Sequence, residues 1–556
     1  LLVSNAFSKL LDKRELAAGL PGYGHDLEED HPAPPYTDAS YRDDEGALWL
    51  DYAADLGEGF DPTYTVAWLL SRNTLELEPG TVTRRGRALV LGGDQVYPSA
   101  KWDAYRDRFV GPYQAALPHL PAAEAPHLFA IPGNHDWYDG LTSFTRLFTQ
   151  RSWIGAWRTR QRRSYFAVRL SERWWLWGTD IQFDTYLDGP QLEYFRHAAA
   201  DLEAGHRVIL ATAKPSWVRA ERDREPAIKK EGAWQTLAFV EQNLIGRSKG
   251  EVALTLTGDH HFYARYTKEK GEGPEHRITA GGGGAHSMGT ATLPAEISPP
   301  SLAQPASSAR YVLGATSPTP AESRDLREGI VGAVMRVPSL GALIGALYAL
   351  IALTFADAVK DHSTGLAAPG GDYSLPSLLW DGGSTWSVGL VLLVAGGLVA
   401  FADVKRRPLV KGLAGGLHAL AHLALALAAP IALILLLDDA EVARHGMLLG
   451  WLAAAGAFAI GFVGLLVFGL YLLVLNRSSS GRHSGEVWGG LASTDYKNFL
   501  RLKIGADERL TIYPVGIRRS AEWKFEPAGD PGEPWFVPAG GEPEAKLIEP
   551  PIVIEP

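Results

Sequence analysis

The chain has 556 residues, 46% of them hydrophobic, which is enough material for two to four domains with large cores. It contains no cysteine, and this excludes a disulfide framework, a thiolate zinc site and a cysteine nucleophile. The net charge of −10 argues against a general nucleic-acid-binding surface, so no nucleic-acid partner is expected.

The first element that can carry chemistry is a strand that ends in an acidic residue. Residues 1–46 are polar and broken by prolines, and they predict an N-terminal arm. Residues 47–55 are mostly apolar and predict a strand that ends at Asp55, while residues 62–73 predict the helix that follows. Two roles are open for Asp55, namely capping that helix and binding a metal.

Two further apolar runs end in polar clusters in the same way. Residues 89–91 are followed by Gly92-Gly93-Asp94 and, three residues on, Tyr97; residues 127–131 are followed by Pro132-Gly133-Asn134-His135-Asp136. Such runs are typical of buried strands, and α/β sheets bind ligands outside the carboxyl ends of their strands. Carboxylate, amide and imidazole donors suit Fe, Mn, Zn or Mg. The sequence therefore predicts a site for metal and phosphate at these strand ends.

The middle of the chain continues the alternation of strands and helices. Residues 164–170 and 173–179 predict a hairpin, and residues 191–204 predict a helix. Residues 208–215 predict another strand. Residues 252–257 predict a strand that ends in Gly258-Asp259-His260-His261. A last strand over 277–280 leads into four glycines and His286, but a glycine run alone is weak evidence of phosphate binding.

The order of these motifs resembles that of the calcineurin-like metallophosphoesterases, which have an Asp motif, Gly-Asp, Gly-Asn-His-Asp and a late Gly-His motif. Residues 133–136 match the third motif letter for letter. Most members write the first motif as Asp-x-His, where this chain has Gly57. Purple acid phosphatases, a branch of the superfamily, also have Gly there and a tyrosine at the position of Tyr97. The resemblance implies an α/β fold, a four-layer αββα sandwich over residues 47–291.

The resemblance also implies a metal site of one or two divalent or trivalent ions. Its phenolate and carboxylate donors favour Fe at the first position, with Mn, Zn or Mg as alternatives. The alternative role for Tyr97 is to cap a strand. The implied ligands are Asp55, Asp94, Tyr97 and His261 for the first ion, and Asp94 as a bridge with Asn134 and Asp259 for the second.

The implied reaction is hydrolysis of a phosphate ester by a hydroxide that the metal activates and that attacks phosphorus in line. His135, oriented by Asp136, would stabilise the transition state or protonate the leaving oxygen. The chain departs from the family at Ala213, where relatives carry a His that binds the second metal. A second hypothesis is therefore a degenerate domain that senses a phosphorylated ligand or nucleotide. A transporter or channel gated by the domain is a third.

The second half of the chain predicts a membrane region. Residues 292–328 are rich in Pro, Ser and Ala and predict a linker, and about four apolar stretches approach the length of a bilayer span. Within the third stretch, His418 and His422 are expected to form hydrogen bonds between helices or to bind a metal or haem. The four stretches are Val337–Ala358, Trp386–Phe401, Gly412–Leu437 and Gly446–Leu475.

Charges beside these stretches predict their orientation. Lys and Arg precede the first stretch and follow the second and fourth, whereas the other two loops carry Asp and Glu. By the positive-inside rule, the phosphoesterase domain and the C-terminus are cytoplasmic, in what is expected to be the inner membrane of a bacterium. The lipid bilayer and a phosphorylated substrate of unknown class are thus the expected partners. The predicted helical region is 329–476, the C-terminal segment 477–525 can pack on the phosphoesterase domain, and 526–556 is an acidic, Pro-rich tail.

Two elements are expected within this C-terminal segment. Residues 495–502 predict a short helix, and residues 501–504 with 509–516 predict a hairpin around Gly505-Ala506-Asp507.

Overall fold

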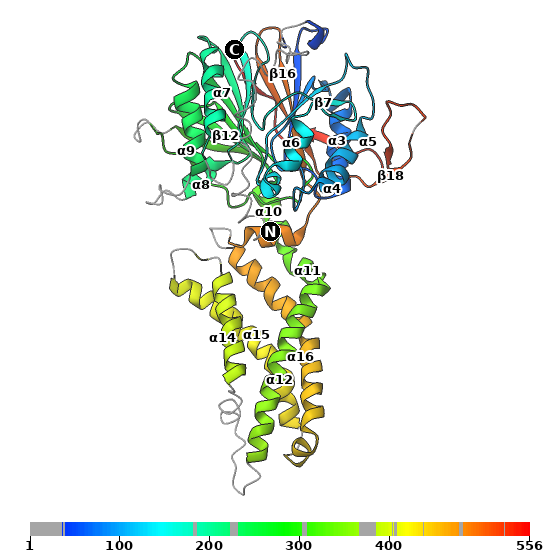
Figure 1. The fold of residues 1–556 in the computed structure, drawn as a ribbon, viewed down its shortest axis with the longest axis vertical. Helices are drawn as coiled ribbons and strands as arrows, with labels where there is room; N and C mark the ends of the chain where they lie inside the picture. The colour runs from blue at the N-terminus through cyan, green and yellow to red at the C-terminus, as the bar shows by residue number, and fades with distance from the viewer. Residues whose placement is uncertain are drawn as a thin grey trace. The chain divides into compact units, whose positions relative to one another are not determined.

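The computed structural model describes residues 36, 39–181, 186–222, 232–302, 309–365, 385–402, 404, 408–436, 439–477, 482–527 and 529–556. The chain divides into two compact units, residues 1–323 with 493–556 and residues 324–492. Most of the predicted N-terminal arm lies outside the described residues. Figure 1 shows the elements of each unit.

The first unit contains a mixed β-sheet in which the predicted strands lie at the centre. β1 (Leu48–Ala53), β4 (Ala88–Leu91) and β5 (His127–Ala130) are parallel neighbours, and every one of their residues is buried. Strands covered on both faces need apolar runs of this kind. The described strands of this sheet follow the order β20 (Ala545–Leu547), β17 (Leu510–Ile517), β16 (Lys497–Ile504), β1, β4, β5, β7 (Trp157–Thr159) and β6 (Trp153–Ile154), with β21 (Ile552–Ile554) also paired to β17.

A second mixed sheet carries the remaining motif. β9, β10, β11 and β13 are parallel, and the predicted hairpin over 164–179 is formed by β8 and β9. The described order is β14 (Glu296–Ile297), β15 (Arg310–Ser317), β12 (Tyr263–Lys270), β13 (His276–Ala280), β11 (Glu251–Thr257), β10 (Arg207–Ala211), β9 (Trp174–Gly178) and β8 (Phe166–Arg169). Two short hairpins, β2 (Thr74–Glu78) with β3 (Thr81–Arg84) and β18 (Trp523–Phe525) with β19 (Phe536–Pro538), lie outside both sheets.

The two sheets share one apolar core, and helices cover their outer faces. Tyr52 and Phe129 of the first sheet lie in the same cluster as Phe166, Leu176 and Ile209 of the second. The predicted mixed α/β sheets are therefore confirmed. In Figure 1 the two groups of helices lie on opposite sides of the unit. They are α3 (Phe60–Ser71), α4 (Trp102–Tyr105), α5 (Gly111–Ala116) and α6 (Thr142–Phe148) on one side, and α7 (Gly189–Ala200), α8 (Ser216–Arg222) and α9 (Gly232–Phe239) on the other.

The sequence-based assignment is wrong in two segments of this unit. Residues 495–502 do not form a short helix but lead into β16, which pairs with β1 on one side and β17 on the other. Residues 310–317, within the predicted linker, form β15 and pair with β12. In each case at least one pairing partner, β1 for β16 and β12 for β15, lies well outside the local stretch of sequence, and this pairing outweighs local propensity. The predicted hairpin over 501–516 is confirmed as β16 and β17.

The described elements of the second unit are helices, most of them apolar. Among the described residues, two helical segments are long and apolar enough to cross a membrane, Pro408–Leu433 and Met447–Asn476. A third span is possible if the segments Pro320–Met335 and Pro338–Thr354, which meet at a 60° bend, count as one. Its elements are α10 (Pro320–Glu328, which begins in the first unit), α11 (Ile330–Met335), α12 (Pro338–Gly365), α14 (Thr385–Phe401), α15 (Pro408–Leu436), α16 (Asp439–Asn476) and α17 (Ser484–Leu491).

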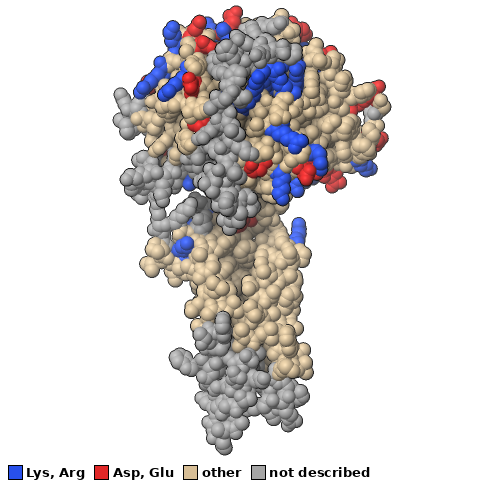
Figure 2. Space-filling model, viewed as in Figure 1, with Lys and Arg blue, Asp and Glu red and all other residues tan. Residues whose placement is uncertain are grey.

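The prediction of about four spans is not supported. The second stretch yields only the short apolar segment Val388–Phe401, and the first is part of the bent pair. Lys405, Arg406 and Arg407, which contributed to the predicted orientation, lie outside the described residues. On the face that Figure 2 shows, the described helices of this unit carry few charged side chains, whereas the first unit carries many.

Candidate metal centre

The six residues predicted to bind metal lie in four loops, each at the carboxyl end of a strand. Asp55 follows β1, Asp94 and Tyr97 follow β4, Asn134 follows β5, and Asp259 and His261 follow β11. β1, β4 and β5 are parallel, so their carboxyl ends share one edge of the first sheet, and β11 brings its loop to them from the second sheet. The structure thus brings together side chains that are as many as 206 residues apart in the sequence.

The Tyr97 hydroxyl lies at the centre of one group of donors. Its oxygen is 2.8 Å from Asp55 Oδ1, 3.2 Å from Asp94 Oδ2 and 3.0 Å from His261 Nε2. A phenol has a single proton and can donate to only one of these three acceptors. The arrangement therefore concentrates more acceptors than the available protons can satisfy.

The His261 ring is held with one nitrogen turned toward this group. Its Nδ1 lies 2.7 Å from the backbone carbonyl oxygen of His286. Because a carbonyl only accepts, Nδ1 must carry the proton, and Nε2 presents a lone pair toward Tyr97. Burial lowers the pKa of His261 and keeps the ring neutral. A neutral imidazole fixed by a hydrogen bond at its other nitrogen is the form in which histidine binds metals.

Asn134 belongs to a second group with Asp94 and Asp259. If its amide is turned so that the nitrogen faces the carboxylates, it donates to Asp94 Oδ2 over 3.3 Å and to Asp259 Oδ1 over 3.0 Å. In the opposite orientation the amide oxygen faces both carboxylates. Three oxygens that face one another are the arrangement expected around a cation. The two groups share Asp94, as the resemblance implies, and the assignment of metals to them stays a prediction.

The backbone at these positions is unusual. Asp55, Asp94 and Asp259 all have positive φ, at 59°, 52° and 64°. Residues other than glycine seldom adopt this region, although Asp tolerates it better than most, and such residues cluster at functional sites. Here each left-handed residue lies two or three positions after its strand ends, in the loop that carries the predicted ligands.

Small residues allow close approach to the Asp55 carboxylate. Its Oδ2 atom would lie 2.6 Å from a Cβ on Gly258 and 2.4 Å from a Cβ on Gly281. The same Oδ2 atom is buried and has no hydrogen-bond partner among the described residues. Burial, and then the nearby charge of Asp94, raise the pKa of Asp55 well above its usual value. Burial raises the pKa of Asp94 to about 6.

These features fit a cation. The donors are oxygen and imidazole nitrogen, and neighbouring donors lie 2.8 to 3.3 Å apart. Among the described residues, one carboxylate oxygen is buried without a hydrogen-bond partner. Within the described part of the chain, no group of three or more His, Cys, Asp or Glu side chains is by itself arranged to hold a metal. The predicted ligands Asp55, Asp94 and His261 do not form such a group on their own, because all three side chains contact the Tyr97 hydroxyl in this structure.

The structure places the two predicted catalytic residues differently from one another. The His135 ring is partly exposed, and its Nδ1 lies 3.0 Å from the Pro98 carbonyl oxygen. Asp136 is fully buried and accepts hydrogen bonds from the backbone N–H groups of Asp94 (2.9 Å) and Gly133 (2.8 Å). Asp136 therefore ties the loops after β4 and β5 together, and Pro98 rather than Asp136 orients the His135 ring.

The departure at Ala213 lies beside the centre. Ala213 is buried, and its Cβ would be 3.1 Å from a Cβ on Gly93. Its carbonyl accepts from the Gly258 N–H over 3.0 Å, directly before Asp259. A histidine at this position would stand next to both loops, so the missing donor leaves the second group with fewer ligands.

Two charged residues that the sequence analysis did not predict, Glu58 and Lys497, bind residues 285–287, which follow the four glycines. Glu58 Oε2 accepts from the backbone and ring nitrogens of His286; although burial opposes it, these bonds lower the pKa of Glu58 to about 2. Lys497, buried on β16, donates to the Ala285 carbonyl and to Ser287 Oγ, and burial lowers its pKa to about 7. The glycines at 281–284 were the available signal, since a Cβ there would lie within 2.6 Å of Asp55, Asn498, Ala54 or Thr63, close to these supporting residues in the sequence.

No family model matches the chain, and no curated protein matches it. Among solved structures it is similar to GAP50, the anchor in the inner membrane complex of Plasmodium, with 12% identity over 44% of this chain and 74% of that one (TM-score 0.32). Purple acid phosphatase PPD1 from yellow lupin (Lupinus luteus) seeds matches with 12% identity over 46% of each chain (TM-score 0.31). PhoD matches with 14% identity over 46% of this chain and 59% of its own (TM-score 0.28).

These likenesses are distant. The chain spans less than two thirds of the lupin phosphatase and PhoD chains, and all three TM-scores are below 0.5. Similarity at this level assigns neither an activity nor a metal.

Proposed function

We propose that the protein is a membrane-anchored, metal-dependent phosphoesterase. The observation that supports this best is the convergence of Asp55, Asp94, Tyr97, Asn134, Asp259 and His261 from four loops of two sheets. A structural role alone does not explain why an unpartnered carboxylate oxygen is buried among further acceptors, because this arrangement costs free energy in the absence of a cation.

The residues divide the work of the proposed reaction. One cation would be held by Asp55, Asp94, Tyr97 and His261. A second would be held by Asn134, Asp259 and the shared Asp94. A bound cation would supply Lewis acidity, polarising a phosphoryl oxygen and lowering the pKa of a water. His135, with Nδ1 held by the Pro98 carbonyl, keeps Nε2 for proton transfer to the leaving oxygen as the ester P–O bond breaks. Asp136 holds the loops after β4 and β5 together by accepting hydrogen bonds from their backbone N–H groups.

The membrane part of the proposal rests on the two apolar segments Pro408–Leu433 and Met447–Asn476. We place the phosphoesterase domain and the C-terminus on the cytoplasmic side of a bacterial inner membrane, from the Arg residues that flank the helical region. Retention in membranes washed at high pH would support the anchor, and release into the supernatant would contradict it.

Substitution of Tyr97 tests the donor set. Purified protein is expected to contain iron and to show a visible phenolate charge-transfer band, and the Tyr97→Phe variant is expected to lose the band while keeping the packing of the ring. Elemental analysis, the absorption spectrum and hydrolysis of an aryl phosphate and an aryl phosphodiester are the measurements. Tyr186→Phe, which changes an exposed tyrosine, is the matched control.

Colourless protein with at most one metal ion per chain would contradict the assignment of iron. If no common divalent ion then supports hydrolysis, the enzyme proposal falls as well, and the second candidate function gains.

That second candidate is a degenerate domain that senses a phosphorylated ligand or nucleotide, and the observation that favours it is Ala213. Alanine offers no donor at a buried position beside Gly93 and Asp259. Under this proposal the chain binds inorganic phosphate or a nucleotide without hydrolysing a phosphate ester.

The Ala213→His variant discriminates between the two candidates. If the remaining ligands already form an active centre, the added imidazole is expected to raise metal stoichiometry and to increase hydrolysis by roughly 10-fold or more, the scale on which metal-site partners act. The readouts are metal content and initial rate. Ala213→Phe adds similar bulk without a donor and is expected to raise neither. A variant that binds more metal but hydrolyses no ester would favour the sensor.

A further inference from the structure

A chain of hydrogen-bonding side chains lies inside the apolar helical unit. The hydroxyl of Tyr348 on α12 is 2.5 Å from His422 Nδ1 on α15, and His422 Nε2 is 2.9 Å from His418 Nε2 one turn away. All three side chains are more than nine-tenths buried. The His418 ring stacks on Tyr471 of α16, with the centroids 3.9 Å apart. Hydrogen bonding between helices at these histidines, expected from the sequence, is therefore present.

The protons of this chain can be arranged in two ways. If Tyr348 donates to His422, His422 donates to His418, and the last proton lies on His418 Nδ1, which is buried and has no partner among the described residues. If the direction is reversed, His418 donates to His422 and His422 donates to the Tyr348 oxygen. The hydroxyl proton of Tyr348 is then free to donate to another acceptor. The second arrangement satisfies both N–H groups within the chain, and it needs one further acceptor for the Tyr348 hydroxyl proton.

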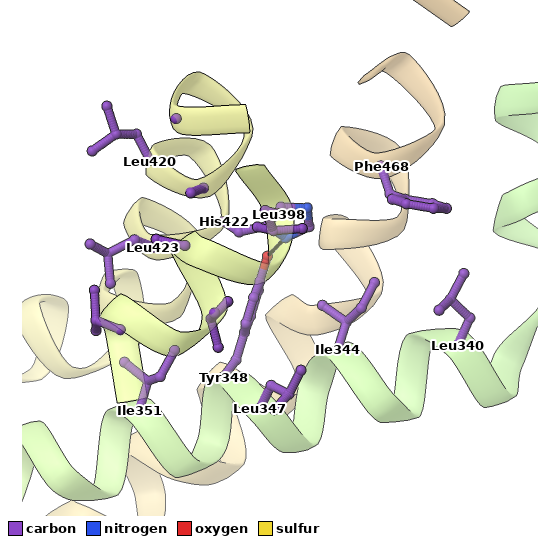
Figure 3. Close-up of a pocket in the computed structure, with 15 residues that line it drawn as sticks. Leu340, Ile344, Leu347, Tyr348, Ile351, Leu398, Leu420, His422, Leu423 and Phe468 are labelled. Carbon is purple, nitrogen blue, oxygen red and sulfur yellow. Dashed lines mark hydrogen bonds between the residues drawn. The ribbon is translucent and has the colours of Figure 1, made fainter. Parts of the chain in front are cut away.

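A cavity of about 420 Å³ lies at the Tyr348 end of the chain. Its size falls within the range of small-molecule sites. Figure 3 shows Tyr348 reaching from its helix to His422, with aliphatic side chains such as Ile344, Ile351 and Leu423 around them. Tyr348 and His422 supply the polar groups of the lining, and none of the lining residues is charged. Leu420, 63% exposed, and Leu347, 37% exposed, place part of the lining at the surface of the unit.

The cavity contrasts with the close packing of the same helices elsewhere. A Cβ on Gly461 of α16 would lie 2.2 Å from the Cα of Gly345 on α12, and a Cβ on Gly415 of α15 would lie 2.4 Å from the Cα of Val399 on α14. Small residues at such contacts are how helices approach each other in membranes. The space that α12, α14 and α15 enclose is therefore not explained by loose packing throughout. Apolar cavities stay dry and take up apolar molecules.

We propose that this cavity binds a neutral acyl lipid whose carbonyl oxygen accepts a hydrogen bond from Tyr348. Hydrocarbon matches the lining, and a carbonyl supplies the acceptor that the second proton arrangement needs. A charged group is excluded, since burial of an unpaired charge among these side chains is costly. Tyr348 lies ten residues after Pro338, about 15 Å along the helix at ~1.5 Å per residue. A phospholipid whose carbonyl reached it would draw its headgroup into the apolar region.

The test uses the delipidated full chain in a detergent that has no ester group. The probe is a photoreactive fatty-acid methyl ester, and two matched probes replace its carbonyl end by a plain alkane or by a phosphate. Saturable labelling of α12 and α15 by the ester, weaker labelling by the alkane and none by the phosphate are expected. Peptide mapping of the cross-links and competition by unlabelled ester are the readouts.

Two variants locate the site. Ala419→Trp fills the cavity and is expected to abolish saturable labelling, whereas Leu417→Trp, on the same helix but 66% exposed and outside the lining, is expected to leave it unchanged. Tyr348→Phe removes the donor and is expected to weaken ester binding by about fivefold, the scale of one hydrogen bond, without weakening alkane binding.

Equal labelling of the two tryptophan variants would overturn the site, because the label would then report a general apolar surface. Ester and alkane binding that fall together in Tyr348→Phe would overturn the role of the carbonyl. Stronger competition by an isoprenoid alcohol than by the acyl ester would overturn the acyl assignment.

Discussion

Replacement of Asp94 by asparagine is expected to abolish metal binding and phosphate-ester hydrolysis while leaving the fold intact. In the wild-type protein the backbone N–H of His135 donates to Asp94 Oδ1 over 2.7 Å, and the amide oxygen of Asn can accept the same hydrogen bond. Asn also tolerates the positive φ of 52° at this position. It removes the charge that the two donor groups share. Loss of an outer-shell partner costs metal sites ~10–100-fold in affinity or activity, and a bridging ligand should cost more.

The measurements for Asp94→Asn are metal content per chain, initial rates with aryl phosphate substrates and the near-ultraviolet circular dichroism spectrum. Asp103→Asn is the matched control, because Asp103 is 77% exposed and makes only a surface ion pair with Arg106. Undiminished hydrolysis by folded Asp94→Asn protein would contradict the proposed centre. Loss of the native spectrum would mean that Asp94→Asn has unfolded, and the proposed centre would then be tested with Tyr97→Phe instead.

The predictable parts of the site are those whose structure depends on a short stretch of sequence. Residues 89–91 and 128–131 are continuous apolar runs, and each is followed by glycine or proline before its polar residues. These runs form the buried parallel strands β4 and β5, whose carboxyl ends place Asp94 and Asn134 in adjacent loops. The rule that sites lie at the carboxyl ends of strands needs no knowledge of distant contacts.

The parts that could not be predicted depend on partners far away in the sequence. The polar and charged residues around 495–502 suggested a short helix, yet the charges of Lys497 and Arg501 are buried against the Ala285 carbonyl and Asp51. The partner of the His135 ring is the Pro98 carbonyl, which no motif encodes because it is a backbone atom. Apolar stretches likewise do not reveal the 60° bend before Pro338 or the shortness of the helix Val388–Phe401, and the count of about four spans is not supported for these two reasons.

The ion pair between Arg501 and Asp51 gives the largest expected effect on stability. Arg501 on β16 is fully buried, its Nε lies 3.3 Å from Asp51 Oδ1 on β1, and its guanidinium donates to the carbonyls of Leu69 and Arg72 at the end of α3. Arg501→Met is expected to destabilise the first unit by about 3–5 kcal/mol, since it removes the positive charge beside the buried Asp51 carboxylate and one donor from each of the two carbonyls. Lys503→Met, which breaks a partly exposed pair with Glu45 on the same strand, should cost less than about 1 kcal/mol.

The pH dependence of this loss distinguishes an unpaired charge from a packing defect. Burial, although opposed by Arg501, raises the pKa of Asp51 to about 6. A carboxyl group whose pKa is raised by folding stabilises the fold below its unfolded pKa of about 4, and this contribution is lost as the pH rises through the folded value. Removing Arg501 raises the pKa of Asp51 further, so the deficit of Arg501→Met should be small in acid and grow above the wild-type pKa. Denaturant unfolding of metal-free protein at pH values on both sides of that pKa measures this. If the deficit does not depend on pH, the loss of stability comes from packing. The double variant Asp51→Leu, Arg501→Met should be more stable than Arg501→Met only if the unpaired charge of Asp51 causes that loss.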